Sequence, residues 1–170
     1  QWEAANKLLE AAKVEGVGHK YLVQHSAGSG KSNTIAWLAH GLASVRNAED
    51  KAIFDGVIIV TDRRVLDDQL GGTVEGFSTQ PGEVLRVADE DSARSKTLAD
   101  ALQGAKRIII VTLQTFPFVL GKLKDAAIRG RKFAVIADEA HSSQSGSAAS
   151  KLKQALGLAE VAAKQGEEGE

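Results

Sequence analysis

The chain has 170 residues, with 21 Lys and Arg against 22 Asp and Glu, so its formal net charge is −1. Hydrophobic residues make up 43% and charged residues 25%, which is ordinary for a globular domain. This length predicts one domain with a single core, and the near-neutral charge argues against a protein that grips nucleic acid over its whole surface. The absence of cysteine excludes disulfides, zinc–thiolate sites and thiol nucleophiles, and it fits a reducing compartment.

Neither a membrane span nor a secretory signal is visible in the sequence. The longest uncharged apolar stretch, Ile108 to Gly121, is too short to cross a bilayer. We therefore expect a cytoplasmic protein without membrane contact. The chain begins at Gln1 and contains no Met, which indicates a piece of a longer protein. We expect residues 1–170 to form one domain, with residues 166–170 as a frayed acidic tail.

In chain order, amphipathic stretches alternate with short apolar runs. Helices are predicted over residues 2–12, 31–45, 63–70, 92–102 and 152–159, and strands over residues 21–25, 57–61, 84–87, 107–112 and 133–137. The pair Gly71-Gly72 is expected to end the helix that starts at residue 63, and Phe116 and Phe118 are expected in the core. Apolar strands joined by helices predict an α/β fold, with a mostly parallel sheet of about five strands covered on both faces.

The most informative run lies between the first predicted strand and the helix that follows it. It consists of Gly28, Ser29, Gly30, Lys31 and Ser32. Glycines let several backbone N–H groups point at one anion, and the helix N-terminus behind them adds partial positive charge. Lys31 is then expected to reach the β- and γ-phosphates of ATP, and Ser32 to coordinate Mg²⁺. Asn33 is counted with the nucleotide-binding residues. The strict phosphate-loop pattern has Gly at the position that His25 occupies, so the match fails at this one residue.

A second run places two acids at the end of a buried strand. Residues 133–137 are apolar, and Asp138 and Glu139 follow directly. Open α/β sheets bind ligands at the carboxyl ends of their strands. Asp138 would hold the Mg²⁺ shell, and Glu139 would orient and deprotonate the attacking water. Together the two runs indicate a nucleoside triphosphatase.

Five segments of the chain resemble one known family. They are HSAGSGKS (25–32), IAWLAH (35–40), VTDRRVLD (60–67), TLQTFP (112–117) and DEAHSSQSG (138–146). The last begins with the DEAH box of helicase superfamily two, and the combination is similar to the motor (restriction) subunit of type I restriction–modification enzymes. The resemblance covers essentially the whole chain, and His often takes the first loop position in that family.

The resemblance implies the first RecA-like lobe, a three-layer sandwich of the P-loop NTPase class, of an ATP-dependent DNA translocase and endonuclease. ATP hydrolysis would pull double-stranded DNA past a complex that contains specificity and methyltransferase subunits. The family's nuclease domain would lie before Gln1, and the second lobe, with the arginine that completes the ATP site, would lie after Glu170. His141 would couple the ATP site to the rest of the motor.

Weaker assignments also follow from the resemblance. Gln1 matches a glutamine that contacts adenine, although a disordered terminus is an equal alternative. Arg63 and Arg64 follow the second predicted strand and could contact the DNA backbone, or could be solvated residues that open a helix. Thr112 and Gln114, at the end of a later predicted strand, could likewise either contact DNA or be solvated.

Two other classes remain open at this point. A phosphate-loop kinase or ATPase that never touches nucleic acid would need a substrate lid, and none is visible. A non-catalytic module with a degenerate ATP site is disfavoured because Lys31, Ser32, Asp138 and Glu139 are all intact.

Overall fold

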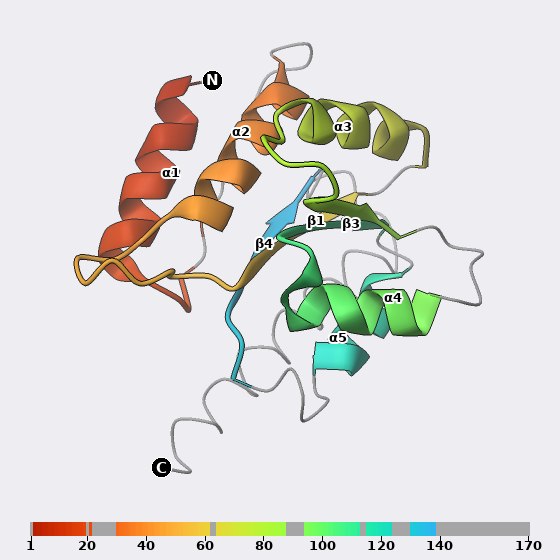
Figure 1. Ribbon diagram of the computed structural model, residues 1–170. Coiled ribbons are helices and arrows are strands. Elements are labelled where there is room, and N and C mark those ends of the chain that lie inside the picture. The colour runs from red at the N-terminus through yellow and green to blue at the C-terminus, as the bar shows by residue number, and fades with distance from the viewer. Residues whose placement is uncertain are drawn as a thin grey trace.

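The computed structural model is an α/β sandwich built on four parallel strands (Figure 1). It describes residues 2–19, 21, 30–61, 64–87, 94–112, 115–123 and 130–138. Its elements are α1 (Trp2–Glu15), α2 (Lys31–Ser44), β1 (Gly56–Thr61), α3 (Arg64–Gly76), β2 (Val84–Arg86), α4 (Arg94–Asp100), the π-helical turn η1 (Ala101–Ala105), β3 (Ile108–Thr112), α5 (Phe116–Leu123) and β4 (Phe133–Ala137). None of the helices in these ranges is long and apolar enough to cross a membrane.

The strands lie in the order β2-β3-β1-β4, and every neighbouring pair is parallel. β1 is central: its register pairs Thr61 with Thr112 of β3 and Val60 with Ala137 of β4. All residues of β1 and β3 are buried, as expected for parallel strands covered on both faces. The carboxyl ends of β1, β3 and β4 therefore meet at one edge of the sheet.

Two apolar clusters cover the two faces of the sheet. On one face, α2 and α3, with Ala12 of α1, pack on alternate strand residues such as Ile59, Ile110 and Ile136. On the other face, α4, η1 and α5 pack on the intervening residues, among them Val60 and Val111. The layers are visible in Figure 1, with α1, α2 and α3 above the sheet and α4 and α5 below it. This alternation assigns each strand residue to one face.

The predicted fold class is confirmed, and four of the five predicted strands are present in the described residues. The remaining strand prediction, residues 21–25, lies outside them except for Tyr21, which is half-exposed and not in a strand. Phe116 is buried at the start of α5, but Phe118 is 42% exposed, so its assignment to the core was wrong. In a helix, residues two positions apart point in different directions, so only one of the two aromatic rings faces the sheet.

The predicted end of a helix at Gly71-Gly72 is also wrong. Helix α3 continues through both glycines to Gly76. Tertiary packing outweighs the low helix propensity of glycine here, because Leu70 and Val74, one turn apart, are both buried against the sheet.

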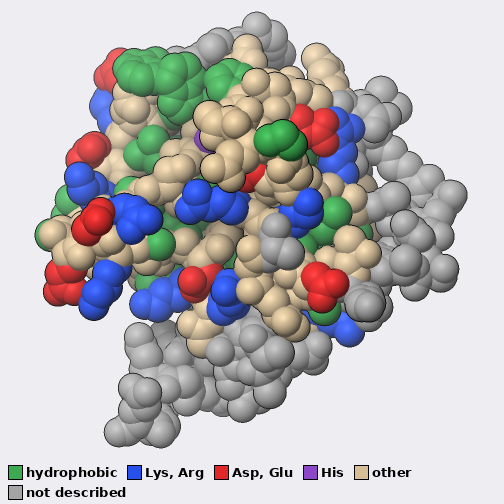
Figure 2. All heavy atoms as spheres, in the orientation of Figure 1, with side chains coloured by type: hydrophobic (Ala, Val, Ile, Leu, Met, Phe, Trp, Pro, Cys, Tyr) green, Lys and Arg blue, Asp and Glu red, His purple; other side chains and the backbone are tan. Residues whose placement is uncertain are grey.

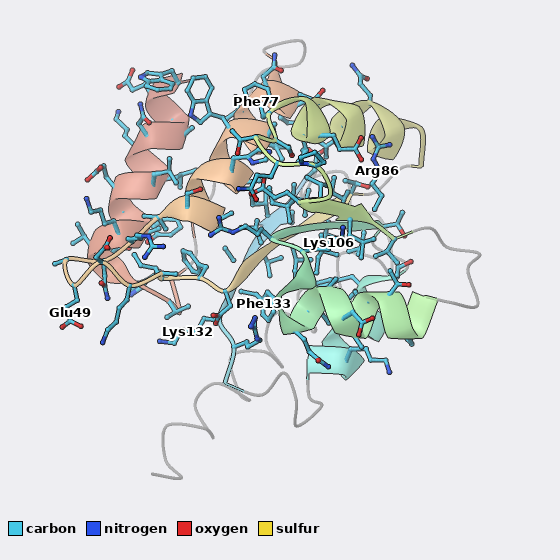
Figure 3. The ribbon with its side chains drawn as sticks, viewed as in Figure 1. Glu49, Phe77, Arg86, Lys106, Lys132 and Phe133 are labelled. Carbon is cyan, nitrogen blue, oxygen red and sulfur yellow. The ribbon has the colours of Figure 1, made fainter. Side chains whose placement is uncertain are left out.

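Gly71 has a packing role that explains its presence inside the helix. Arg86 at the end of β2 donates two hydrogen bonds to Glu75 of α3, at 3.0 and 2.9 Å. A Cβ atom on Gly71 would lie 2.3 Å from Nε of Arg86. At exposed Gly72 the nearest atom would be 3.8 Å away. The bare backbone at Gly71 thus gives the Arg86 guanidinium room to reach α3 (Figure 3).

The two glycines should therefore respond differently to alanine. We expect Gly72→Ala to raise the free energy of unfolding by about 0.5–1 kcal/mol, the usual gain in a helix interior. Gly71→Ala should gain less or lose stability, because the methyl group displaces Arg86 from Glu75. Urea unfolding of both variants measures this difference, and equal gains would contradict the packing role of Gly71.

Candidate functional site

A row of polar residues lies at the carboxyl edge of the sheet, on the face that α2 covers. Thr61 and Thr112 are paired in register, and the backbone N–H of Asp138 donates to the carbonyl of Val60 at 2.9 Å, which continues the ladder one residue beyond β4. Ile59, Ile110 and Ile136 precede these three residues by two positions and belong to the cluster under α2. The side chains of Thr61, Thr112 and Asp138 therefore point to the α2 side.

Helix α2 begins at this edge with a glycine in the left-handed conformation. Gly30 has φ 74° and ψ 36°, which costs an L-residue about 1–2 kcal/mol. The Gly30 carbonyl accepts hydrogen bonds from the backbone N–H groups of Asn33 and Thr34, at 3.1 and 3.2 Å. No acidic residue lies in the first turn, so the positive end of the helix dipole is not neutralised from within the helix.

An ion pair joins the start of α2 to the polar row. Nζ of Lys31 lies 2.9 Å from Oδ1 of Asp138. The carboxylate side chain is 8% exposed and the lysine side chain 33% exposed. The structure therefore brings together the two charged residues that the sequence assigned to the phosphates and the metal, from positions 107 residues apart in the chain (138 − 31).

The residues at this edge fit a Mg²⁺ ion. Although Oδ1 of Asp138 is at ion-pair distance from Lys31, it is buried and receives no hydrogen bond of acceptable geometry. A buried carboxylate oxygen in this state can accept a metal ligand or a metal-bound water. Mg²⁺ is typically held by one or two carboxylates, together with waters and substrate phosphates. Asp138 and the hydroxyl group of Ser32, the second residue of α2, supply suitable oxygen atoms.

An aromatic hollow, which the sequence interpretation missed, lies beside the first turn of α2. Its volume is about 330 Å³, and its lining residues are Trp2, Ala5, Asn33, Thr34, Trp37 and Phe77. The rings of Trp2 and Trp37 meet edge to face, with centroids 4.1 Å apart, and Phe77 lies 6.1 Å from Trp37. Figure 2 shows hydrophobic side chains gathered over the N-terminal end of α1. The tryptophans are 35 residues apart (37 − 2), so only the packing of α1 on α2 reveals the site.

Phe77 is held in place by a contact between α2 and α3. Nε2 of His40 donates to the carbonyl of Val74 at 2.8 Å, and the His40 ring stacks on Phe77 with centroids 6.5 Å apart. His40 had no assigned role in the sequence. It joins α2, which begins with Lys31, to α3, which ends one residue before Phe77.

The other predicted site residues divide into two groups. Thr112 is buried, and its hydroxyl donates to that of Thr115 at 3.2 Å; Arg64 is the first residue of α3. Their contacts with DNA stay predictions. The remaining residues lie outside the described part of the chain, so their roles also stay predictions: Gln1, Gly28, Ser29, Arg63, Gln114, Glu139 and His141.

The ion pair makes a stability prediction in the absence of any nucleotide. We expect Lys31→Met to lower the free energy of unfolding by about 1–3 kcal/mol, because the buried Asp138 carboxylate loses its cation. Thermal unfolding measures this loss. Adding Asp138→Asn to Lys31→Met removes the stranded charge and should recover most of the stability. If the single and double variants unfold alike, the pair does not stabilise the fold.

Comparisons with known proteins point to an ATPase family. Residues 1–166 match a protein family described as SWI2/SNF2 ATPase. A curated relative from Mycoplasma pneumoniae (strain ATCC 29342 / M129 / Subtype 1), described as the C-terminal part of a "Putative type I restriction enzyme MpnIIP endonuclease subunit", is 31% identical over 137 residues. That match covers 79% of this chain and 60% of the relative. This chain therefore spans less than two thirds of the relative's length. No solved structure matches this chain.

Proposed function

Because this chain belongs to the SWI2/SNF2 ATPase family, we propose that it is the ATP-binding motor lobe of a restriction-enzyme subunit that translocates DNA. The observation that carries the proposal is the 2.9 Å pair between Lys31 and Asp138, at the edge of the sheet where α2 begins. A lysine at a helix N-terminus beside a buried carboxylate is the arrangement that phosphoryl-transfer sites use. The type I relative supports the assignment to restriction.

Each charged residue then has a distinct task. Lys31 turns from Asp138 to the β- and γ-phosphates, while the backbone of Gly28, Ser29 and Gly30 cradles them. Bound Mg²⁺, held through Asp138 and Ser32, would supply positive charge that neutralises the phosphates. Glu139 takes the proton of the attacking water. The lysine therefore exchanges one anionic partner for another when the nucleotide binds.

The aromatic hollow is the place we propose for the adenine base. Asn33 and Thr34 line it and lie within one helical turn of Lys31, so one nucleotide can contact both regions. A volume of about 330 Å³ falls at the small end of the range for ligand pockets, about 300–1,000 Å³. Trp2, Trp37 and Phe77 offer ring faces and edges for stacking. The adenine contact that the family resemblance implies for Gln1, which lies outside the described residues, is part of the same proposal.

The wider proposal concerns the parent protein. There the lobe would use ATP hydrolysis to move double-stranded DNA. Contacts with the DNA backbone would come from Arg63, Arg64, Thr112 and Gln114. His141 would couple the ATP site to the rest of the motor. Specificity and methyltransferase subunits would supply recognition of the DNA site. We place the parent in the cytoplasm, where its DNA substrate and ATP are found.

Intrinsic fluorescence tests the nucleotide site directly, because Trp2 and Trp37 are the two tryptophans of the chain. We expect a saturable change in emission on titration with ATP and Mg²⁺. Lys31→Met should weaken ATP binding about 10–100-fold, since a hydrogen bond to a charged group contributes about 1.5–3 kcal/mol. Trp37→Phe should retain binding, measured by calorimetry, while reducing the signal. Unchanged ATP affinity in Lys31→Met would contradict the assignment.

A second expectation is that this chain alone hydrolyses ATP very slowly, with or without DNA. In related triphosphatases an arginine that approaches the γ-phosphate from outside contributes about 10³–10⁵ in turnover. The family resemblance places that arginine in a second lobe. Steady-state phosphate release from the 170-residue chain, with and without long linear duplex DNA, measures this. Brisk, DNA-stimulated turnover would mean that the chain already holds a complete catalytic site.

A further inference from the structure

The hydroxyl group of Thr61 is a buried polar group that the proposed function does not use. Thr61 is 0% exposed at the carboxyl end of β1, and its Oγ1 has no hydrogen-bond partner in the structure. Its neighbour in register, Thr112, does have one in Thr115, at 3.2 Å. A buried hydroxyl without a hydrogen bond costs free energy, whereas a valine of the same shape would not. This cost needs an explanation.

The position of Thr61 beside Asp138 supplies one. Val60 pairs with Ala137, and Asp138 continues that ladder, so Thr61 and Asp138 occupy the next position on adjacent strands. Both side chains point to the α2 face, and neighbouring strands lie about 4.8 Å apart. Oδ1 of Asp138 is likewise buried without a hydrogen bond. Two buried oxygen atoms, one a donor and one an acceptor, therefore stand side by side without a hydrogen bond.

In the structure, Nζ of Lys31 lies 2.9 Å from Oδ1 of Asp138. When Lys31 turns to the phosphates, the carboxylate loses this partner and could change its rotamer. A hydrogen-bond donor on the adjacent strand would then keep the carboxylate directed at the metal. The Thr61 hydroxyl is available for this role, because turning it about the χ1 bond to another staggered position would break no existing hydrogen bond.

We propose that Thr61 is a positioning residue: in the nucleotide-bound state its hydroxyl donates to the Asp138 carboxylate and orients it toward Mg²⁺. The inference rests on the proposed function, since it requires Lys31 to leave Asp138 for a nucleotide. It acts through Asp138 rather than on the nucleotide itself. Its effect therefore shows in the Mg²⁺ requirement of nucleotide binding.

The test uses Thr61→Val, which removes the hydroxyl and keeps the shape. Without nucleotide, the variant should have a Tm equal to or above that of the native chain. In ATP titrations at a series of Mg²⁺ concentrations, the Mg²⁺ needed for half-maximal affinity should rise about tenfold, as expected for one lost hydrogen bond to a charged group. Thr61→Ser, which restores the hydroxyl, should return the Mg²⁺ requirement to the native value.

Thr112→Val is the matched control, because it removes a buried hydroxyl from the same row that is already bonded to Thr115. It should lower the Tm and leave the Mg²⁺ requirement of ATP binding unchanged, because these titrations contain no DNA and the role proposed for Thr112 is a contact with DNA. The proposal is overturned if Thr61→Val keeps the native Mg²⁺ requirement, if Thr61→Ser fails to restore it, or if Thr61→Val lowers the Tm as Thr112→Val does. If Lys31→Met weakens ATP binding while Thr61→Val does not change the Mg²⁺ requirement, this inference alone fails. If the native chain does not bind ATP, the proposed function fails with it.

Discussion

Parallel pairing of β1 with both β3 and β4 is the constraint on which the rest of this structure depends. It brings three carboxyl ends to one edge of the sheet, with Thr112, Thr61 and Asp138 in one row. Because side chains alternate along each strand, all three face α2. The apolar stripe of α2 packs on the same face, and this packing places Lys31, its first residue, at the charged end of the row.

The same packing links the charged edge to the aromatic hollow. Ala36 and Ala39 of α2 are fully buried, so the helix lies close to the sheet and its outer side is left for α1 and α3. Trp37 on that outer side meets Trp2 of α1 and Phe77 after α3. One helix thus carries the phosphate end and the base end of the proposed site. Its placement is more informative about function than any single motif.

The sequence was most informative where a pattern is local. Strands β1 and β3 follow from runs of β-branched residues, and β4 follows from a short apolar run. The glycine-rich run and the acidic pair were sufficient to single out Lys31 and Asp138. Prediction from the sequence failed where long-range packing determines the local structure. Helix α3 continues through Gly71 because its neighbours bury apolar side chains. The unpartnered hydroxyl of Thr61 depends on the register of two strands, which no local pattern encodes.

The central claim is that a nucleotide takes Lys31 away from Asp138. A crystal structure of this chain with a non-hydrolysable ATP analogue and Mg²⁺ tests it most directly. We expect Nζ of Lys31 at hydrogen-bond distance from phosphate oxygens, with the Asp138 carboxylate among the Mg²⁺ ligands. A bound nucleotide elsewhere on the surface, with Lys31 still 2.9 Å from Asp138, would contradict it.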